Sequence, residues 1–185
     1  MSSVNILKTL GMGKGITMNI TIDEAEPEDS INRYAMDTIC TGEEIINVPP
    51  HWHKNHAEYL SVIEGRVELT LNGDRVILKA GDPALCVPRR IVHSCKSFEG
   101  ENVILRERPD PAGLYKAIPL QGFIRFFNDI LSTGTFGGFW HILRAFYDGD
   151  TYIPLPLHSQ FLDEVFLTVF GAIAHLFAPR KPESL

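Results

Sequence analysis

Residues 49–58 of the chain read PPHWHKNHAE, and the segment that follows them ends at Gly65. His51 and His53 are two positions apart, so on an extended strand both imidazoles point to the same face of a sheet. Glu58 comes after four further residues, which is enough for a bend that brings its carboxylate to the same point. His93 lies just beyond a second apolar run. Together these side chains supply three imidazoles and one carboxylate.

This set of side chains predicts a divalent metal site. Imidazole and carboxylate ligands suit Fe(II), Mn(II), Zn(II), Cu(II) and Ni(II), and four protein ligands leave room for water or substrate on a six-coordinate ion. Scattered surface or core histidines are the alternative, since the chain has seven histidines in all. Four ligand-type residues in register with strand and turn signals favour the metal site. His56 is a further candidate, either as a donor or catalytic base, or as a solvent-facing loop residue.

The same residues resemble the motifs of a known family. The spacing His51-x-His53-x4-Glu58-x6-Gly65 is similar to the first motif of the cupin superfamily, and Gly81-Asp82 followed by PRRIVH at 88–93 is similar to the second. Arg90 stands where the second motif usually has a turn glycine. The resemblance covers residues 30–108 and implies a small jelly-roll β-barrel. It also implies that one metal ion is bound by His51, His53, Glu58 and His93.

Hydrophobic alternation independently predicts a mainly β fold. Residues 16–22 alternate apolar and polar side chains, as a half-buried strand does. Asn72-Gly73 separates two apolar runs and predicts a two-residue hairpin, because a type I′ turn needs positive φ at both positions. Short strands with frequent turns are typical of a sandwich or barrel. We expect a strand at 45–48 that stops at Pro49-Pro50, and others at 33–40, 59–63, 67–71, 75–78, 84–87 and 102–106.

The pattern changes at Pro109, where a proline- and glycine-rich break begins. We expect a cupin domain with its N-terminal arm at 1–112, and a helical C-terminal extension at 113–185 that packs on the barrel or on a dimer mate. Helical spacing of apolar residues occurs at 123–131, 136–147 and 161–178. The last segment is apolar on nearly every face, but its uncharged part is shorter than the roughly 20 residues of a bilayer span. We therefore expect a homodimer, with interfacial membrane contact through 161–178 as the alternative.

Composition narrows the class of protein. The net charge of −6 and the absence of a basic run argue against nucleic-acid binding. Three cysteines without a CxxC pair indicate reduced thiols, and the first 14 residues lack the apolar stretch of a signal peptide, so a cytoplasmic protein is expected. Cys86 is expected in the core and Cys95 either in the core or near the metal.

The resemblance implies a site and leaves the reaction open, because one fold hosts many chemistries. The preferred hypothesis is a metal-dependent dioxygenase, with Fe(II) favoured, that acts on a small, apolar, polyketide- or aromatic-like substrate. A non-redox isomerase, cyclase or dehydratase is the first alternative, with Glu58 or His56 moving a proton beside a Lewis-acidic metal. A non-catalytic ligand-binding module is the second. Arg106, which ends a predicted barrel strand, is the candidate for binding a substrate carboxylate.

Overall fold

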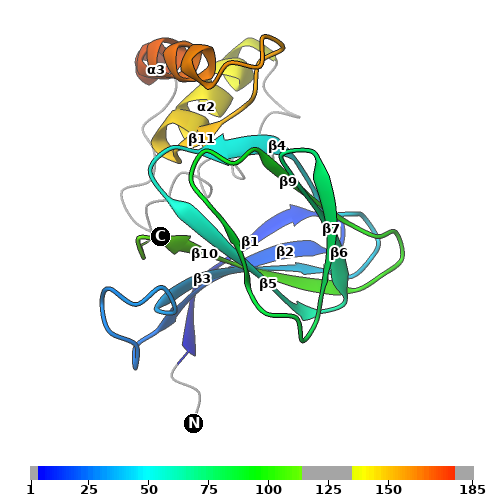
Figure 1. Cartoon of the computed structure of the whole chain (residues 1–185). Helices are drawn as coiled ribbons and strands as arrows, with labels where there is room; N and C mark the ends of the chain where they lie inside the picture. The colour runs from blue at the N-terminus through cyan, green and yellow to red at the C-terminus, as the bar shows by residue number, and fades with distance from the viewer. Residues whose placement is uncertain (1–3, 114–134, 178–185) are drawn as a thin grey trace.

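The computed structural model describes residues 4–113 and 135–177 (Figure 1). Within these residues ten strands come first, and two helices with one short strand between them follow, so the prediction of a mainly β jelly roll with a helical C-terminal extension is confirmed. The strands of the first range are β1 (Val4–Gly13), β2 (Ile16–Asp23), β3 (Tyr34–Cys40), β4 (Asn47–His53), β5 (Ala57–Glu64), β6 (Arg66–Leu71), β7 (Asp74–Lys79), β8 (Leu85–Val87), β9 (His93–Ser97) and β10 (Val103–Asp110). Helix α2 (Thr135–Asp148), strand β11 (Thr151–Tyr152) and helix α3 (Gln160–Phe177) follow.

Two antiparallel sheets face each other. One has the strand order β1-β2-β3-β10-β5-β8 and the other β11-β4-β9-β6-β7. The sheets are not joined into one closed barrel, so the jelly roll is a sandwich with two layers. Strands β4, β5 and β9, which carry the candidate ligands, come from both layers.

The hairpin between β6 and β7 is formed as the sequence predicts. Asn72 and Gly73 have φ values of 49° and 96°, and Leu71 pairs with Asp74 across the turn. Both central residues are therefore in the conformation that the two-residue turn requires. The strands at 16–22, 33–40 and 59–63 are also present, within two residues of the expected bounds.

The prediction that a strand stops at Pro49-Pro50 is wrong. Strand β4 continues through both prolines, and its pairing with β9 is irregular between Val48 and His51. On its other side, β4 pairs with β11 only at Trp52 and His53. Prolines have no N–H to donate, so they are tolerated where the ladder is interrupted. Beyond them, regular pairing resumes at the histidines.

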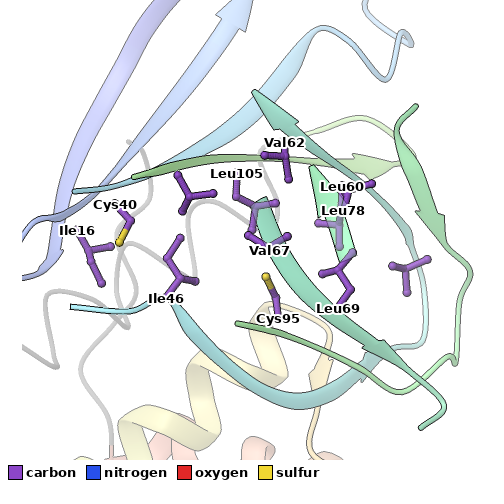
Figure 2. Packing of buried hydrophobic residues seen from close by; sticks show 12 residues of the cluster. Ile16, Cys40, Ile46, Leu60, Val62, Val67, Leu69, Leu78, Cys95 and Leu105 are labelled. Atoms are coloured by element: carbon purple, nitrogen blue, oxygen red, sulfur yellow. The ribbon is translucent and has the colours of Figure 1, made fainter. Parts of the chain in front are cut away.

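The core lies between the two sheets (Figure 2). Side chains from both layers point toward one another there, with the thiols of Cys40 and Cys95 among them. The prediction that Cys86 lies in the core is wrong. Cys86 is exposed, because β8 is the edge strand of its sheet and the side chain points outward. The buried aliphatic side chains of this core include Leu60, Val62, Val67, Leu69, Leu78, Val87, Val103 and Leu105.

The described part of the C-terminal extension packs against the outer side of β4 (Figure 1). Trp52 is fully buried there, and its ring stacks on Tyr152 with centroids 4.3 Å apart. Its indole N–H donates to Asp163 at the start of α3 over 3.1 Å. Leu143, Leu167 and Ala174 complete this second cluster. The extension is thus attached to the strand that carries two candidate ligands.

Helices α2 and α3 agree with the segments expected at 136–147 and 161–178, while the expected helical segment at 123–131 lies outside the described residues. The domain division at residue 112 stays a prediction. Among the described helices, α3 alone has the length and hydropathy of a membrane span, and 22% of it is buried. Apolar side chains on its outer face include Phe161, Val165 and Val169.

Candidate metal centre

Strand alternation positions the first two candidate ligands. His51 and His53 point inward from β4, while Trp52 between them points out toward the extension. His93 opens β9 and is the direct cross-strand partner of His51. Glu58, the second residue of β5, reaches the same point from the opposite sheet. The site therefore lies between the two layers at one end of the sandwich.

The four side chains form a compact, buried group, which we call the metal cluster: His51, His53, Glu58 and His93. One ligand atom from each lies within 4.8 Å of all the others. Glu58 Oε2 is 3.1 Å from His93 Nε2 and 4.0 Å from His53 Nε2. None of the four is more than 9% exposed. The structure thus brings together all four ligands that the sequence suggested.

Hydrogen bonds fix the tautomer of each histidine. The Nδ1 atoms of His51, His53 and His93 lie 2.8, 3.0 and 3.0 Å from the backbone carbonyl oxygens of Pro49, Asp150 and Ile91. A carbonyl can only accept, so each Nδ1 carries the proton and donates it. Each Nε2 then keeps its lone pair, as a metal ligand must.

The donor set therefore fits a divalent metal ion. Three neutral imidazoles and one carboxylate leave such an ion with a net positive charge, and a six-coordinate ion would keep open positions. The carboxylate of Glu58 lies within hydrogen-bond distance of His93 Nε2, so the oxygen and nitrogen donors already converge on one point. A divalent cation binds such a mixed donor set.

The loop before His93 is held against the cluster. Arg90 takes the left-handed conformation, with a φ of 66°, at the position where a glycine was expected. Its backbone N–H donates to the carbonyl of His53 over 2.8 Å. A non-glycine residue accepts this φ at a cost of about 1 kcal/mol or more. The ion pair of Arg90 with Glu164 in α3, at 2.7 Å, helps to offset it.

A cavity of about 260 Å³ opens onto the metal cluster through His51, Glu58 and His93. Most of its described lining is apolar and comes from both sheets, including β1, and from the extension. The extension contributes Ala145, Phe146, Gly149, Thr151 and Ile153. The apolar lining also includes Met12, Met18, Ile46, Val48, Leu60 and Leu105. The C-terminal extension therefore forms part of the wall.

Glu107 is a cavity residue that the sequence analysis missed. It lines the cavity from β10, beside Leu105, and its cross-strand partner Leu60 lies two residues from Glu58. Extending the alternation of β10 past Arg106 would have found it. The carboxylate of Glu107 also affects Cys95. The pKa of this thiol is raised far above its ordinary value, mainly by burial and then by the charges of Glu107 and Glu58.

Arg106 is placed differently from the expectation. Its guanidinium donates two hydrogen bonds to the carboxylate of Asp37, at 2.6 and 2.7 Å, and this pairing raises the pKa of Arg106. Leu105 and Glu107, its neighbours on β10, line the cavity, so alternation directs Arg106 to the other face of the sheet. The predicted contact with a substrate carboxylate has no support in this arrangement.

His56 is buried rather than solvent-facing, with 1% of its surface exposed. Its Nδ1 lies 3.0 Å from Asp150 Oδ2, and its ring stacks on His53 with centroids 4.0 Å apart. It belongs to a second group of possible ligands with His53 and Asp150. His56 is not among the described residues that line the cavity, so its placement does not support direct proton transfer to a substrate.

Residues 42–105 match the family profile described as Cupin domain. The solved structure of KdgF from Halomonas sp. is similar, with 22% identity, a TM-score of 0.44, and coverage of 57% of this chain and 87% of that one. The cupin domain of Cnp3 from Schizosaccharomyces pombe has 16% identity and a TM-score of 0.42, with coverage of 70% and 78%. No curated protein matches.

Proposed function

We propose that this chain, which belongs to the cupin superfamily, is a metal-dependent enzyme that acts on a small apolar organic molecule, and that its reaction is a dioxygenation at Fe(II). One observation carries the proposal: three members of a buried cluster of three histidines and a glutamate, His51, Glu58 and His93, line a mostly apolar cavity. Such a combination would hold an ion with open positions next to a mostly apolar space.

A metal held by these four residues would supply a Lewis-acidic centre for a chelating substrate and O₂. Fe(II) is the preferred ion, and Zn(II), Mn(II), Ni(II) and Cu(II) suit the same ligands. The protein's own part is to hold the imidazoles in the ligating tautomer through the carbonyls of Pro49, Asp150 and Ile91. The apolar wall orients the substrate and excludes water.

The cavity limits the substrate class. Its volume of about 260 Å³ lies just under the range of about 300–1,000 Å³ for sites that take drug-sized ligands. Among the described lining residues there is no lysine or arginine, whereas there are two carboxylates, Glu58 and Glu107. A neutral molecule, or one whose anionic oxygens bind the metal, therefore fits better than a free carboxylate or phosphate.

Glu107 favours a second candidate, a non-redox isomerase, cyclase or dehydratase. A carboxylate that lines the cavity is placed to accept a proton from carbon next to a carbonyl that the metal polarises. Glu58, as a ligand, would set the charge of the centre. In this route Glu107 would move the proton, and a metal held by the cluster would supply the polarising charge.

Oxygen uptake tests the first proposal. Protein purified without chelators is loaded with Fe(II) under argon and offered β-dicarbonyl and catechol-like compounds in an oxygen electrode. We expect O₂ consumption that requires both iron and an apolar substrate. Stoichiometric iron with no O₂ uptake across both compound classes would contradict the dioxygenase.

Deuterium exchange tests the second candidate. A simple ketone is incubated in D₂O with Zn(II)- or Mn(II)-loaded protein, and incorporation at the carbon beside the carbonyl is measured by NMR. Glu107→Gln should slow the exchange at least about 100-fold, the lower end of the range for general-base catalysis. Arg106→Gln, the neighbouring residue on the other face of β10, is the matched control and should leave it unchanged. Equal exchange in wild type and Glu107→Gln would refute this role, and bound ligand without turnover in either assay would indicate a binding module.

A further inference from the structure

We propose that Asp150, in the turn between α2 and β11, is a positioning residue that orients His53 and thereby makes the metal centre depend on the C-terminal extension. This inference rests on the proposed metal centre. Asp150 is buried, with 9% of its surface exposed, and has a φ of 54°. The next residue, Thr151, pairs with His53 in the β11–β4 ladder, so Asp150 lies directly beside the ligand-bearing end of β4.

The backbone carbonyl of Asp150 acts on His53 directly. It accepts the Nδ1 proton of His53 over 3.0 Å, which leaves Nε2 as the ligating atom. The corresponding carbonyls for His51 and His93 come from Pro49 and Ile91, each two residues from its histidine. His53 alone takes its orienting group from a distant part of the chain, 97 residues away.

The side chain of Asp150 fixes the turn that joins the two ligand-bearing strands β4 and β5. Its Oδ2 accepts from the backbone N–H of Asn55 over 2.6 Å and from His56 Nδ1 over 3.0 Å. Its Oδ1 accepts from the side-chain amide of Asn55 over 2.8 Å. Hydrogen bonds to a charged acceptor are roughly twice as strong as neutral ones. One carboxylate therefore holds residues 55 and 56 between His53 and Glu58.

His56 passes this constraint back to His53. The two rings stack with centroids 4.0 Å apart and an interplanar angle of 27°. His53 is the one member of the metal cluster that does not appear among the described residues lining the cavity. Its far side is covered by His56 and Asp150, so its orientation is set from outside the cavity. Substrate contacts would not correct a misplaced ring.

A second cation site is the competing explanation, because ligand atoms of His53, His56 and Asp150 also lie within 4.8 Å of one another. The hydrogen bonds argue for positioning instead. His53 Nδ1 already donates its proton to the backbone carbonyl of Asp150. The Asp150 carboxylate accepts three hydrogen bonds, two of them from Asn55. The number of ions bound per chain distinguishes the two explanations.

The test is a Co(II) titration of the full chain, followed by visible absorption, with Asp150→Asn as the variant. Asparagine keeps the shape and the backbone carbonyl but turns one acceptor into a donor, which then faces Asn55 or His56. We expect one Co(II) per wild-type chain and a 10- to 100-fold weaker affinity in Asp150→Asn, the usual effect of losing an orienting partner of a ligating histidine. The absorption bands should also shift, and far-UV circular dichroism should be unchanged.

Asp148→Asn is the matched control. Asp148 lies in the same helix end and pairs with Arg144 and His175 inside the extension, so its loss should not change Co(II) affinity. A metal-independent readout is the Nδ1 proton of His56, which should give a slowly exchanging NMR signal in wild type and lose it in Asp150→Asn.

Wild-type affinity and spectrum in Asp150→Asn would overturn the positioning role and leave the metal centre intact. Two ions per wild-type chain, one of them lost in Asp150→Asn, would replace positioning with a second cation site. No Co(II) binding by wild type would refute the metal centre itself.

Discussion

At the scale of single residues, the site is defined by which nitrogen of each histidine carries the proton. Three backbone carbonyls fix that choice for His51, His53 and His93. The sequence could predict these residues as candidate ligands because strand alternation and the spacing to Glu58 are local properties. It could not predict the carbonyl of Asp150, because that contact spans 97 residues. The sequence analysis also predicted that Arg106 faces the substrate, whereas in the structure its neighbour Glu107 lines the cavity.

The three cysteines give a prediction about thiol reactivity. Cys95 lies in the cavity wall, and burial with the nearby carboxylates of Glu107 and Glu58 raises its pKa, so the thiol stays protonated at pH 8. The thiolate is the nucleophile, and Cys95 should therefore resist iodoacetamide. Cys86 is exposed and should be alkylated, whereas Cys40 is buried and should not react. Peptide mass spectrometry of native protein should find one modified cysteine.

Denatured protein is the control for this experiment and should be modified at all three cysteines. Alkylation of Cys95 in the native state at a rate similar to that of Cys86 would contradict the burial and the raised pKa described here.

At the scale of elements, α2 and α3 pack through a glycine contact. A Cβ atom added at Gly171 would lie 2.5 Å from Cβ and 2.7 Å from Cγ of Tyr147. The contact is close to the backbone of α2, so Tyr147 cannot move aside by rotating its far end. Gly171→Ala should lower the free energy of unfolding by about 1–3 kcal/mol, as overpacking does. Urea unfolding would measure it.

Gly11→Ala is the matched control, because a Cβ at Gly11 would meet nothing within 4 Å. It should change the free energy of unfolding by less than about 0.5 kcal/mol. An equal effect of the two substitutions would show that the close packing of α2 on α3 does not contribute to stability.

At the scale of the whole molecule, the extension and the sandwich are connected by charge as well as by the Trp52 cluster. Glu164 in α3 pairs with Lys54 and Arg90, at 2.6 and 2.7 Å, and the hydrogen bond from Lys54 is the main cause of the lowered pKa of Glu164. A lowered carboxylate pKa stabilises the folded state above the ordinary value near 4.5, and that contribution is lost as the pH falls through the lowered value.

We therefore expect acid to loosen α3, and Glu164→Gln to remove this part of the pH dependence. Hydrogen exchange of residues 160–177 between pH 5 and 3 would measure it. Glu101→Gln is the control, because Glu101 also has its pKa lowered by an arginine, Arg66, but lies in the sandwich. Equal acid sensitivity of α3 in Glu164→Gln and wild type would contradict this account.

The sequence could predict most of the sandwich, because alternation and the Asn72-Gly73 turn are local signals. It could not predict that β4 continues through Pro49, since this depends on which neighbours pair with the strand at that point. The sequence also predicted helices after residue 113. It could not predict that Asp150 orients His53, because that contact arises only from tertiary packing. The homodimer, the membrane contact through 161–178 and the cytoplasmic location stay predictions. Analytical ultracentrifugation with and without lipid vesicles would address the first two.

The central claim is that His51, His53, Glu58 and His93 bind one metal ion. The most direct test is the metal content of the wild-type chain, purified without chelators and then equilibrated with Fe(II) or Zn(II), against His93→Ala and the control Lys96→Ala on the same strand. We predict about one ion per chain in wild type and Lys96→Ala, and loss of the ion on gel filtration in His93→Ala, because a ligand is missing. Equal metal content in all three proteins would contradict the account.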